Sequence, residues 1–343
     1  MVKTFHISLP TSPAIPCVSP PKVTIVIPVW NSGAWLPRCL ARLSQQTFQD
    51  FETILVDNGS TDGSVDLARH NNPRLKIIAF ETNQGFAAAV NAGIRQTRSE
   101  YIALLNVDTR PDPDWLEQLV CALDRSPVEV GSVSSKMLVL EDPDLIDDAG
   151  DTLSWYGSAR KRGYQTPAVH YNELEEVFSA CAGAALYRRV FFETVGLFDE
   201  EYTSYFEDVD LGLRGRLYGY RCLYVPEAQV LHQGHSTGVV GGRYVSLMTC
   251  NRLMTFLKNV PLRLLLKHGY HLLFGQFYFF LVYKKPWDSL KGYGRCLLKM
   301  PHIIRQRQRI LPARAIPLEA LDNLLSLELG EPALRDIIRH KLF

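Results

Sequence analysis

The sequence predicts an α/β fold in which a parallel sheet carries helices on both faces. Between residues 22 and 125, short apolar runs alternate with stretches of helical periodicity, and strands that alternate with such helices form βαβ units. Polar side chains also follow each apolar run directly. With 343 residues, of which 46% are hydrophobic and 21% charged, the chain can form one large core and an extension.

The expected elements follow one another closely. Strands are predicted for residues 23–28, 51–56, 75–80 and 101–105, and helices for residues 35–43, 64–70, 86–96 and 114–123. In parallel sheets, ligands bind beyond the carboxyl ends of the strands. The polar residues at those ends are Asn31, Asp57, Asn83, Asn106 and Asp108. Ordinary loop polarity is the alternative explanation, but it does not predict that all four loops lie at one edge of one sheet.

Asn106, Val107 and Asp108 form the most informative motif. They end an apolar run that begins at Tyr101, and residues i and i+2 at a strand end point the same way. An amide oxygen and a carboxylate at the mouth of a sheet suit a hard divalent cation that also binds substrate phosphates. The alternative is an aspartate in a turn before Pro111, which requires no ligand.

Glu207 and Asp208 form a second candidate site. They follow Tyr205 and Phe206 and begin an expected helix. A carboxylate there can act as a general base towards a hydroxyl nucleophile. The alternative is the favourable interaction of acids with a helix N-terminus, which explains Asp210 better than it explains a carboxylate pair directly after aromatic residues.

The absence of other motifs disfavours several classes of protein. The loop at residues 28–33 matches neither G-x-G-x-x-G nor G-x-x-x-x-G-K-[ST], which disfavours dinucleotide dehydrogenases and P-loop NTPases. The seven cysteines are dispersed without a C-x-x-C pair, which favours reduced thiols in a cytosol. Residues 1–21 are polar and proline-rich, so we expect a flexible arm and no signal peptide.

In order along the chain, these motifs resemble those of inverting family 2 glycosyltransferases, most closely the bacterial rhamnosyltransferase-like branch. The matching segments are residues 23–31, 56–64, 83–93, 104–108, 182–185, 196–200, 206–211, 232–236 and 251–252. Each segment is common, but the ordered set is specific. The resemblance implies the GT-A fold, a Rossmann-like, mixed, mainly parallel sheet flanked by helices, with a C-terminal helical extension.

The resemblance also implies roles for individual residues at the nucleotide-sugar site. Asp57 would contact a pyrimidine base, and its carboxylate can accept a hydrogen bond from a pyrimidine N–H. The residues implied to line the nucleotide site or border the donor are Pro28, Val29, Asn31, Asp57, Asn83, Gly85, Phe86 and Asn91.

The implied metal is Mg²⁺ or Mn²⁺. Asn106, Val107 and Asp108 take the place of the family's D-x-D motif, with asparagine at its first position. One carboxylate still suits Mg²⁺, which commonly binds one or two protein carboxylates together with phosphates and waters. His232 would reach the diphosphate or the metal. The alternative for His232 is a loop histidine that is hydrogen-bonded to the backbone.

By the same resemblance, Asp208 is the catalytic base and Glu207 lies beside it towards the acceptor. The expected donor is dTDP-L-rhamnose, followed by UDP-hexoses, and the expected acceptor is a glycan or lipid-linked sugar of surface polysaccharide synthesis. One rival is a nucleotidyltransferase, which usually carries a glycine-rich, arginine-containing loop that residues 29–35 lack. The other is a non-catalytic assembly partner, which retention of Asp108 and Asp208 disfavours.

Asp147, Asp148 and Asp151 belong to an acidic stretch that begins at Glu141. We expect this stretch to be a solvated acidic loop. The alternative is that it lines the acceptor site.

The C-terminal quarter is basic and aromatic. Between Lys258 and Arg314, twelve lysines and arginines accompany a single acid, Asp288. Residues 269–283 are rich in aromatic side chains but fall short of the ~20 apolar residues of a spanning helix. We expect this helix to lie on an anionic membrane surface. A buried helix or a homodimer contact is the alternative, and we expect no nucleic-acid partner.

These observations divide the chain into three parts. They are a flexible arm (residues 1–21), a GT-A glycosyltransferase domain (22–260) and a helical extension (261–343). We expect the protein in the cytoplasm, at the cytoplasmic face of the inner membrane.

Overall fold

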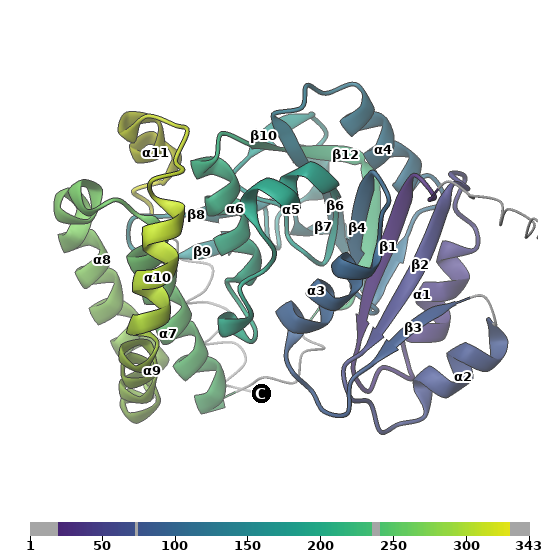
Figure 1. The fold of residues 1–343 in the computed structure, drawn as a ribbon, viewed down its shortest axis with the longest axis horizontal. Coiled ribbons are helices and arrows are strands. Elements are labelled where there is room, and N and C mark those ends of the chain that lie inside the picture. The colour runs from purple at the N-terminus through teal and green to yellow at the C-terminus, as the bar shows by residue number, and fades with distance from the viewer. Residues whose placement is uncertain (1–19, 73–74, 235–240, 330–343) are drawn as a thin grey trace, which may run out of the picture.

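The computed structural model describes residues 20–72, 75–234 and 241–329. Nearly all of the expected N-terminal arm, and residues 235–236 of the matching segment 232–236, therefore lie outside the described residues. Figure 1 shows the sheet with its covering helices and, at the end of the molecule opposite β3 (Lys76–Ala79), a group of C-terminal helices.

Ten strands form one mixed sheet in the order β10-β12-β6-β11-β4-β1-β2-β3, with β5 paired to β12 and β7 to β6. Besides β3, they are β1 (Val23–Val29), β2 (Phe51–Asp57), β4 (Tyr101–Leu105), β5 (Thr109–Pro111), β6 (Val130–Val139), β7 (Asp142–Asp148), β10 (Glu175–Val177), β11 (Ala184–Arg188) and β12 (Arg221–His232). Strands β3, β2, β1 and β4 are parallel, whereas β11 is antiparallel to β4 and β6. Strands β8 (Asp151–Leu153) and β9 (Ala159–Lys161) form a separate hairpin-like pair.

The predicted α/β fold is confirmed, and each of the eight predicted elements matches the structure within one residue at either end. The helices are α1 (Leu36–Leu43), α2 (Ser64–Asn71), α3 (Phe86–Gln96), α4 (Trp115–Asp124), α5 (Arg189–Val195), α6 (Glu207–Leu217), α7 (Gly241–Asn259), α8 (Leu262–Tyr283), α9 (Pro286–Leu298), α10 (Met300–Ile310) and α11 (Leu318–Leu324). Two short 3₁₀ turns are η1 (Ala168–His170) and η2 (Glu200–Tyr202).

The alternation of side chains along β1 explains why helices cover both faces of the sheet. Ile25 and Ile27 pack into a core with α1 and α4, whereas Val26 packs on the other face with α3, because successive strand residues point to opposite faces. Helix α3 lies very close to β1, since a Cβ added at Gly93 would come within 2.4 Å of a Val26 methyl group. The sheet is therefore fixed between two apolar layers.

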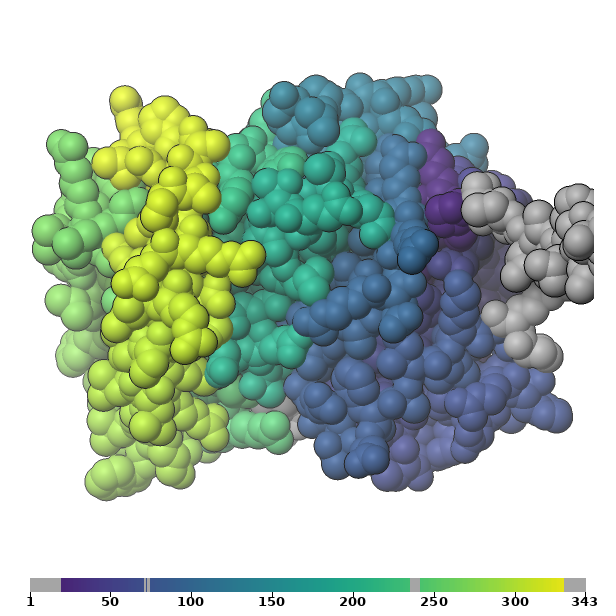
Figure 2. Space-filling view, viewed as in Figure 1, coloured from purple at the N-terminus to yellow at the C-terminus, as the bar shows by residue number. Residues whose placement is uncertain are grey.

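A third core joins the C-terminal helices to the rest of the molecule. Side chains of α6, α7, α8, α9, α10 and α11 pack together around Trp155, which is almost fully buried. In the space-filling view of Figure 2, the yellow C-terminal segment covers one end of the teal middle of the chain. No helix among the described residues is long and apolar enough to cross a membrane. The predicted division at residue 260 stays a prediction.

Candidate active site

The loops after β1 and β2 lie side by side because these strands pair in parallel, with Val29 opposite Asp57. The Asn31 side chain, in a left-handed residue with φ 48°, accepts a hydrogen bond from the backbone N–H of Thr61 at 2.8 Å. This hydrogen bond ties the two loops together. The predicted residues gathered at this edge of the sheet are Pro28, Val29, Asn31 and Asp57.

Asn58, which the sequence analysis did not single out, connects this edge to the next loop. Its buried amide donates to the Asn83 side chain and to the Gly85 carbonyl, both at 3.1 Å. Its oxygen accepts the Gln84 N–H at 2.8 Å. The only indication of this role in the sequence was its position directly after Asp57. The turn that contains Asn58 lies beside the exposed Asn83.

Gly85 and Phe86 contact the chain just before α6. The Phe86 N–H donates to the Thr203 carbonyl at 3.1 Å, and a Cβ at Gly85 (φ 94°) would lie 2.7 Å from the same oxygen. Asn91 is placed differently from the other predicted donor residues. It is fully buried and its amide is hydrogen-bonded to the backbone of Phe198, so it can act on the site only by holding this packing.

The Asn106–Asp108 motif begins directly after β4. The Asn106 N–H donates to the Gly183 carbonyl at 2.8 Å, and Val107 is buried. Asp108 is 2% exposed, and its Oδ1 lies 3.5 Å from Nε2 of His232. The structure therefore brings together the two residues that were predicted to hold a metal, from positions 124 residues apart in the sequence (232 − 108).

His232 lies between two carboxylates. Its other ring nitrogen, Nδ1, lies 2.7 Å from Asp147. Although burial opposes the shift, the hydrogen bonds to Asp108 and Asp147 raise the pKa of His232 to about 9. A carboxylate on the far ring nitrogen is the usual way to orient a metal-binding histidine. No group of three or more His, Cys, Asp or Glu side chains within the described ranges could hold a metal ion.

Asp208 lies at the start of α6 and faces the segment that leads into β11. One of its oxygens accepts the Ala182 N–H at 3.4 Å and the other accepts the Val209 N–H at 2.8 Å. Burial raises the pKa of Asp208. Burial and the neighbouring Asp208 charge raise the pKa of Glu207 to about 8. Glu207 therefore keeps its proton at neutral pH.

The turn before α6 (residues 203–206) is strained. Thr203, Tyr205 and Phe206 have φ values of 64°, 68° and 71°, a region that costs a non-glycine residue about 1–3 kcal/mol. The buried Asn251 amide holds the turn, because its two N–H groups are shared among the carbonyl oxygens of Tyr202, Ser204 and Tyr205 at 2.8–3.1 Å. Strain of this kind persists only where the surrounding structure over-determines it. The position of Asp208 is therefore set by α7.

The expectation of a solvated acidic loop at Asp147, Asp148 and Asp151 is wrong, because all three residues are buried. Asp147 pairs with Lys161 at 2.7 Å, and although burial opposes the shift, Lys161 and His232 hold its pKa below the usual value. Burial raises the pKa of Asp148 to about 7 and that of Asp151 well above the usual value. The charge of Asp208 contributes to both increases.

Asp210 is a structural acid, which the sequence analysis explained by its place at a helix start. The structure shows a larger role, because Asp210 is fully buried and paired with Arg214 at 2.9 Å and with Lys258 at 2.8 Å. It also accepts hydrogen bonds from Tyr202 and Asn259. Lys258, the first residue of the basic stretch, is buried, and nothing in the sequence indicated this pairing.

The comparisons with known proteins agree with this geometry. The sequence model described as "Glycosyl transferase family 2" matches residues 24–196, which is about half of the chain and includes β1 to β4 and β11. The chain belongs to glycosyl transferase family 2. This glycosyltransferase is 32% identical over 246 residues to the N-acetylglucosaminyl-diphospho-decaprenol L-rhamnosyltransferase of Mycobacterium tuberculosis, covering 63% of this chain and 79% of that protein. The resemblance to the rhamnosyltransferase-like branch is confirmed.

Two further similarities support the family and the fold. The O-antigen biosynthesis protein RfbC of Myxococcus xanthus is 30% identical over 223 residues, which cover 62% of this chain and 17% of RfbC. The crystal structure of GalNAc-T7 with UDP, GalNAc and Mn²⁺ superposes with a TM-score of 0.53 at 17% identity, covering 69% of this chain and 51% of that one. The glycosyltransferase therefore has the expected GT-A fold.

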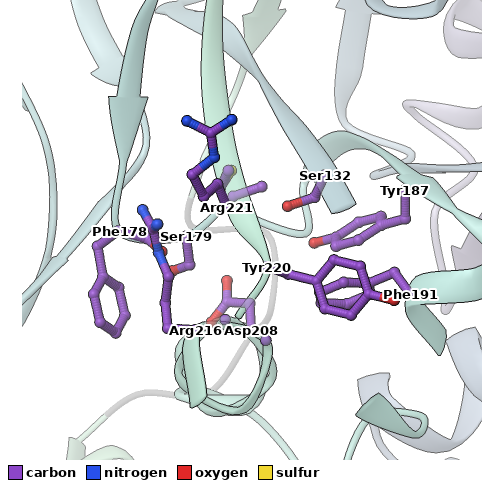
Figure 3. A pocket seen from close by; sticks show the side chains of 13 residues that line it. Ser132, Phe178, Ser179, Tyr187, Phe191, Asp208, Arg216, Tyr220 and Arg221 are labelled. Carbon is purple, nitrogen blue, oxygen red and sulfur yellow. The ribbon is translucent and has the colours of Figure 1, made fainter. Parts of the chain in front are cut away.

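A small cavity lies beside Asp208 of this glycosyltransferase. Figure 3 shows the Asp208 side chain rising from α6 among Ser179, Tyr187, Phe191 and Tyr220. The cavity has a volume of about 10 Å³, which is about the space that one water molecule needs. The cavity is too small to hold a sugar.

Proposed function

We propose that this glycosyltransferase transfers a sugar, with inversion at the anomeric carbon, from a nucleoside-diphosphate sugar to a hydroxyl of a glycan or lipid-linked acceptor. One observation carries the proposal: Asn106 and Asp208 contact neighbouring residues of one segment, Gly183 and Ala182. The motif that would hold the leaving diphosphate and the carboxylate that would activate the acceptor therefore contact adjacent residues of the same segment. The rivals, a nucleotidyltransferase and an assembly partner, do not require this juxtaposition.

The nucleotide would lie over the ends of β1 and β2. Asp57 can accept a hydrogen bond from a pyrimidine N–H, and Asn31 and Asn83 border the same edge. The donor is a dTDP-rhamnose or a UDP-hexose, an assignment supported by similarity to a rhamnosyltransferase. The pathway would be surface polysaccharide synthesis, as the printed name of RfbC suggests.

The residues at β4 and β12 fit a divalent cation, Mg²⁺ or Mn²⁺. Asp108 supplies a carboxylate and His232 an imidazole, which Asp147 orients through Nδ1. Diphosphate oxygens and waters would complete the shell, and a related structure contains Mn²⁺. When bound, the cation offsets the negative charge that develops on the leaving diphosphate. His232 must release its Nε2 proton to become a ligand, so binding should strengthen as the pH rises.

Asp208 would act as the general base. The acceptor hydroxyl gives its proton to the Asp208 carboxylate while its oxygen forms a bond to the anomeric carbon and the bond to the diphosphate breaks. Because burial raises the pKa of Asp208, its basicity moves towards neutral pH, where a general base is most effective. Glu207, which keeps its proton, can donate a hydrogen bond to the acceptor.

The test compares Asp208→Asn and Asp108→Asn with Asp66→Asn, which removes an exposed carboxylate on α2. We expect Asp208→Asn to lower the transfer rate by about 10²–10⁴-fold while UDP or dTDP still raises the melting temperature in the presence of Mn²⁺. Asp108→Asn should lose that metal-dependent increase, and Asp66→Asn should change neither. Nuclear magnetic resonance of the product gives the anomeric configuration.

Full transfer activity of Asp208→Asn would contradict the assigned base. Retention of configuration would contradict inversion. Failure of every nucleotide sugar to turn over in the wild-type chain would favour the assembly partner.

A further inference from the structure

Helix α8 exposes an apolar face and buries polar side chains against the protein. Its polar residues His268, His271 and Gln276 are buried, with exposed fractions of 7–8%. Seven of its large apolar residues point away from the protein, with exposed fractions of 52–76%. The exposed apolar residues are Leu262, Leu266, Tyr270, Leu273, Phe274, Phe277 and Leu281. A surface helix normally shows the opposite arrangement.

Specific contacts fix this orientation of α8. The His268 ring stacks on Trp155 at 4.0 Å, and its Nε2 lies 2.6 Å from an Asp322 oxygen. The helix backbone packs tightly at Gly275, where a Cβ would lie 2.0 Å from the Tyr156 carbonyl oxygen. Rotation of α8 to bury its apolar face would break these contacts. The apolar face is therefore presented outwards by the fold itself.

The exposed apolar residues form one continuous stripe. Leu262, Leu266, Tyr270, Leu273, Phe277 and Leu281 are separated by three or four residues, so they lie along one side of the helix. We call this set, together with Phe274, the α8 stripe. At 1.5 Å per residue, the 22 residues of α8 give the stripe a length of roughly 30 Å.

Positive charge surrounds the α8 stripe. Arg263 and Lys267 lie near its start, Lys284 and Lys285 follow its end, and Trp287 beyond them is 76% exposed. The only acid between residues 258 and 314 is at position 288. Two copies of this chain that paired through the stripe would bring like charges together. An anionic surface would instead attract the basic residues while apolar side chains leave water.

We propose that the α8 stripe docks into the interfacial region of an anionic lipid bilayer. The helix would lie in the plane of the membrane, with its buried histidines facing the protein. Figure 1 places α8 at the end of the molecule farthest from β3, so docking leaves the loops after β1 and β2 uncovered. This proposal does not depend on glycosyl transfer, because it rests on α8 alone.

The test is co-sedimentation of the full chain with vesicles of phosphatidylcholine alone or mixed with phosphatidylglycerol. We expect binding to the anionic vesicles, weaker binding at high salt, and little binding to the neutral ones. Leu273→Glu/Phe277→Glu should abolish binding. Lys284→Glu/Lys285→Glu should weaken it by about tenfold or more. The matched control is Val169→Glu/Leu174→Glu, which changes two equally exposed apolar residues outside α8 and should leave binding intact.

Circular dichroism and nucleotide-induced thermal shifts verify that each variant is folded. Equal vesicle binding by wild type and Leu273→Glu/Phe277→Glu would overturn the proposal. So would an absence of wild-type binding. A dimer in light scattering that dissociates in that variant, without vesicle binding, would assign the stripe to a second copy of the chain. Loss of transfer activity with vesicle binding intact would count only against the proposed reaction.

Discussion

The loops after β1 and β2 are joined to each other by exposed hydrogen bonds to backbone groups, whereas the turn before α6 is held by buried amides and charges. In the first region, Asp62 accepts the Gly33 N–H at 2.9 Å within a water-accessible turn. In the second, Asn251 and the ions around Asp210 are almost inaccessible to water. Buried polar groups lose more when a partner is removed. Changes in the first region should therefore alter ligand binding, and changes in the second should alter both folding and catalysis.

The largest expected difference between the two regions is in the free energy of unfolding, when one aspartate in each region is replaced. Asp210→Ala leaves Arg214 and Lys258 without their shared buried carboxylate, so the free energy of unfolding should fall by about 3–5 kcal/mol. Asp62→Ala removes hydrogen bonds at an exposed turn and should cost about 1 kcal/mol. Urea denaturation measures both values. Equal losses would show that burial does not separate the two regions.

A second prediction concerns the contact between the regions. Gly85→Ala places a Cβ 2.7 Å from the Thr203 oxygen in a residue with φ 94°, so we expect a loss of roughly 3 kcal/mol in stability and weaker donor binding. Gly294→Ala on α9 is the matched control, because no atom lies within 4 Å of its added methyl group. Thermal melting and nucleotide titration provide the measurements. If Gly85→Ala changed neither the stability nor donor binding, the segments that contain Gly85 and Thr203 would be able to move apart without cost.

The third prediction tests how α7 supports Asp208. Asn251→Ala removes three hydrogen bonds to the turn before α6 and should cost about 2 kcal/mol. Because the turn positions Asp208, kcat should fall by tenfold or more, consistent with ~1.4 kcal/mol of lost positioning, while KM for the donor changes little. Asn72→Ala, which loses one hydrogen bond at the end of α2, is the control. A change in donor KM alone would contradict the assignment.

The last prediction depends on pH. The pKa of Glu207 is raised from 4.5 to about 8 in the folded chain, so its contribution to stability is present below pH 4.5 and is lost as the pH rises towards 8. Glu207→Gln mimics the protonated acid and cannot titrate. Relative to the wild type, this variant should therefore become more stable as the pH increases across that window. Melting curves that stay parallel at all pH values would contradict the shifted pKa.

The first half of the fold could be predicted from the sequence because its periodicity is strong. Apolar runs such as Tyr101–Leu105 are bounded by polar residues, and α3 begins at a glycine and ends before Thr97. Strands β5 to β10 were not predicted. Most of them have three residues, which is too short for an alternating pattern of apolar and polar residues to be recognised. The positions of β5, β7 and β10 depend on pairing with β6 or β12 rather than on local pattern.

The candidate site shows the same division. Asp57 and Asn106 could be identified because each directly follows an apolar strand. Asp147 could not be distinguished from the exposed Asp142 and Asp144 a few residues earlier. Asp147 is buried because His232 and Lys161, which belong to other strands, pack against it. A sequence reports the composition of a segment, but it does not report which distant cation will neutralise one of its acids.

The left-handed residues before α6 have a consequence for which side chains can occupy them. Glycine would adopt this backbone with less strain, so the residues actually present must contribute through their side chains. Phe206 fills the third core, and Tyr205 meets Tyr244 edge-on at 5.2 Å. The strained backbone thus places two aromatic rings in packed positions. A glycine introduced at either position would relax the turn but remove the ring that packs α6 against the rest of the protein.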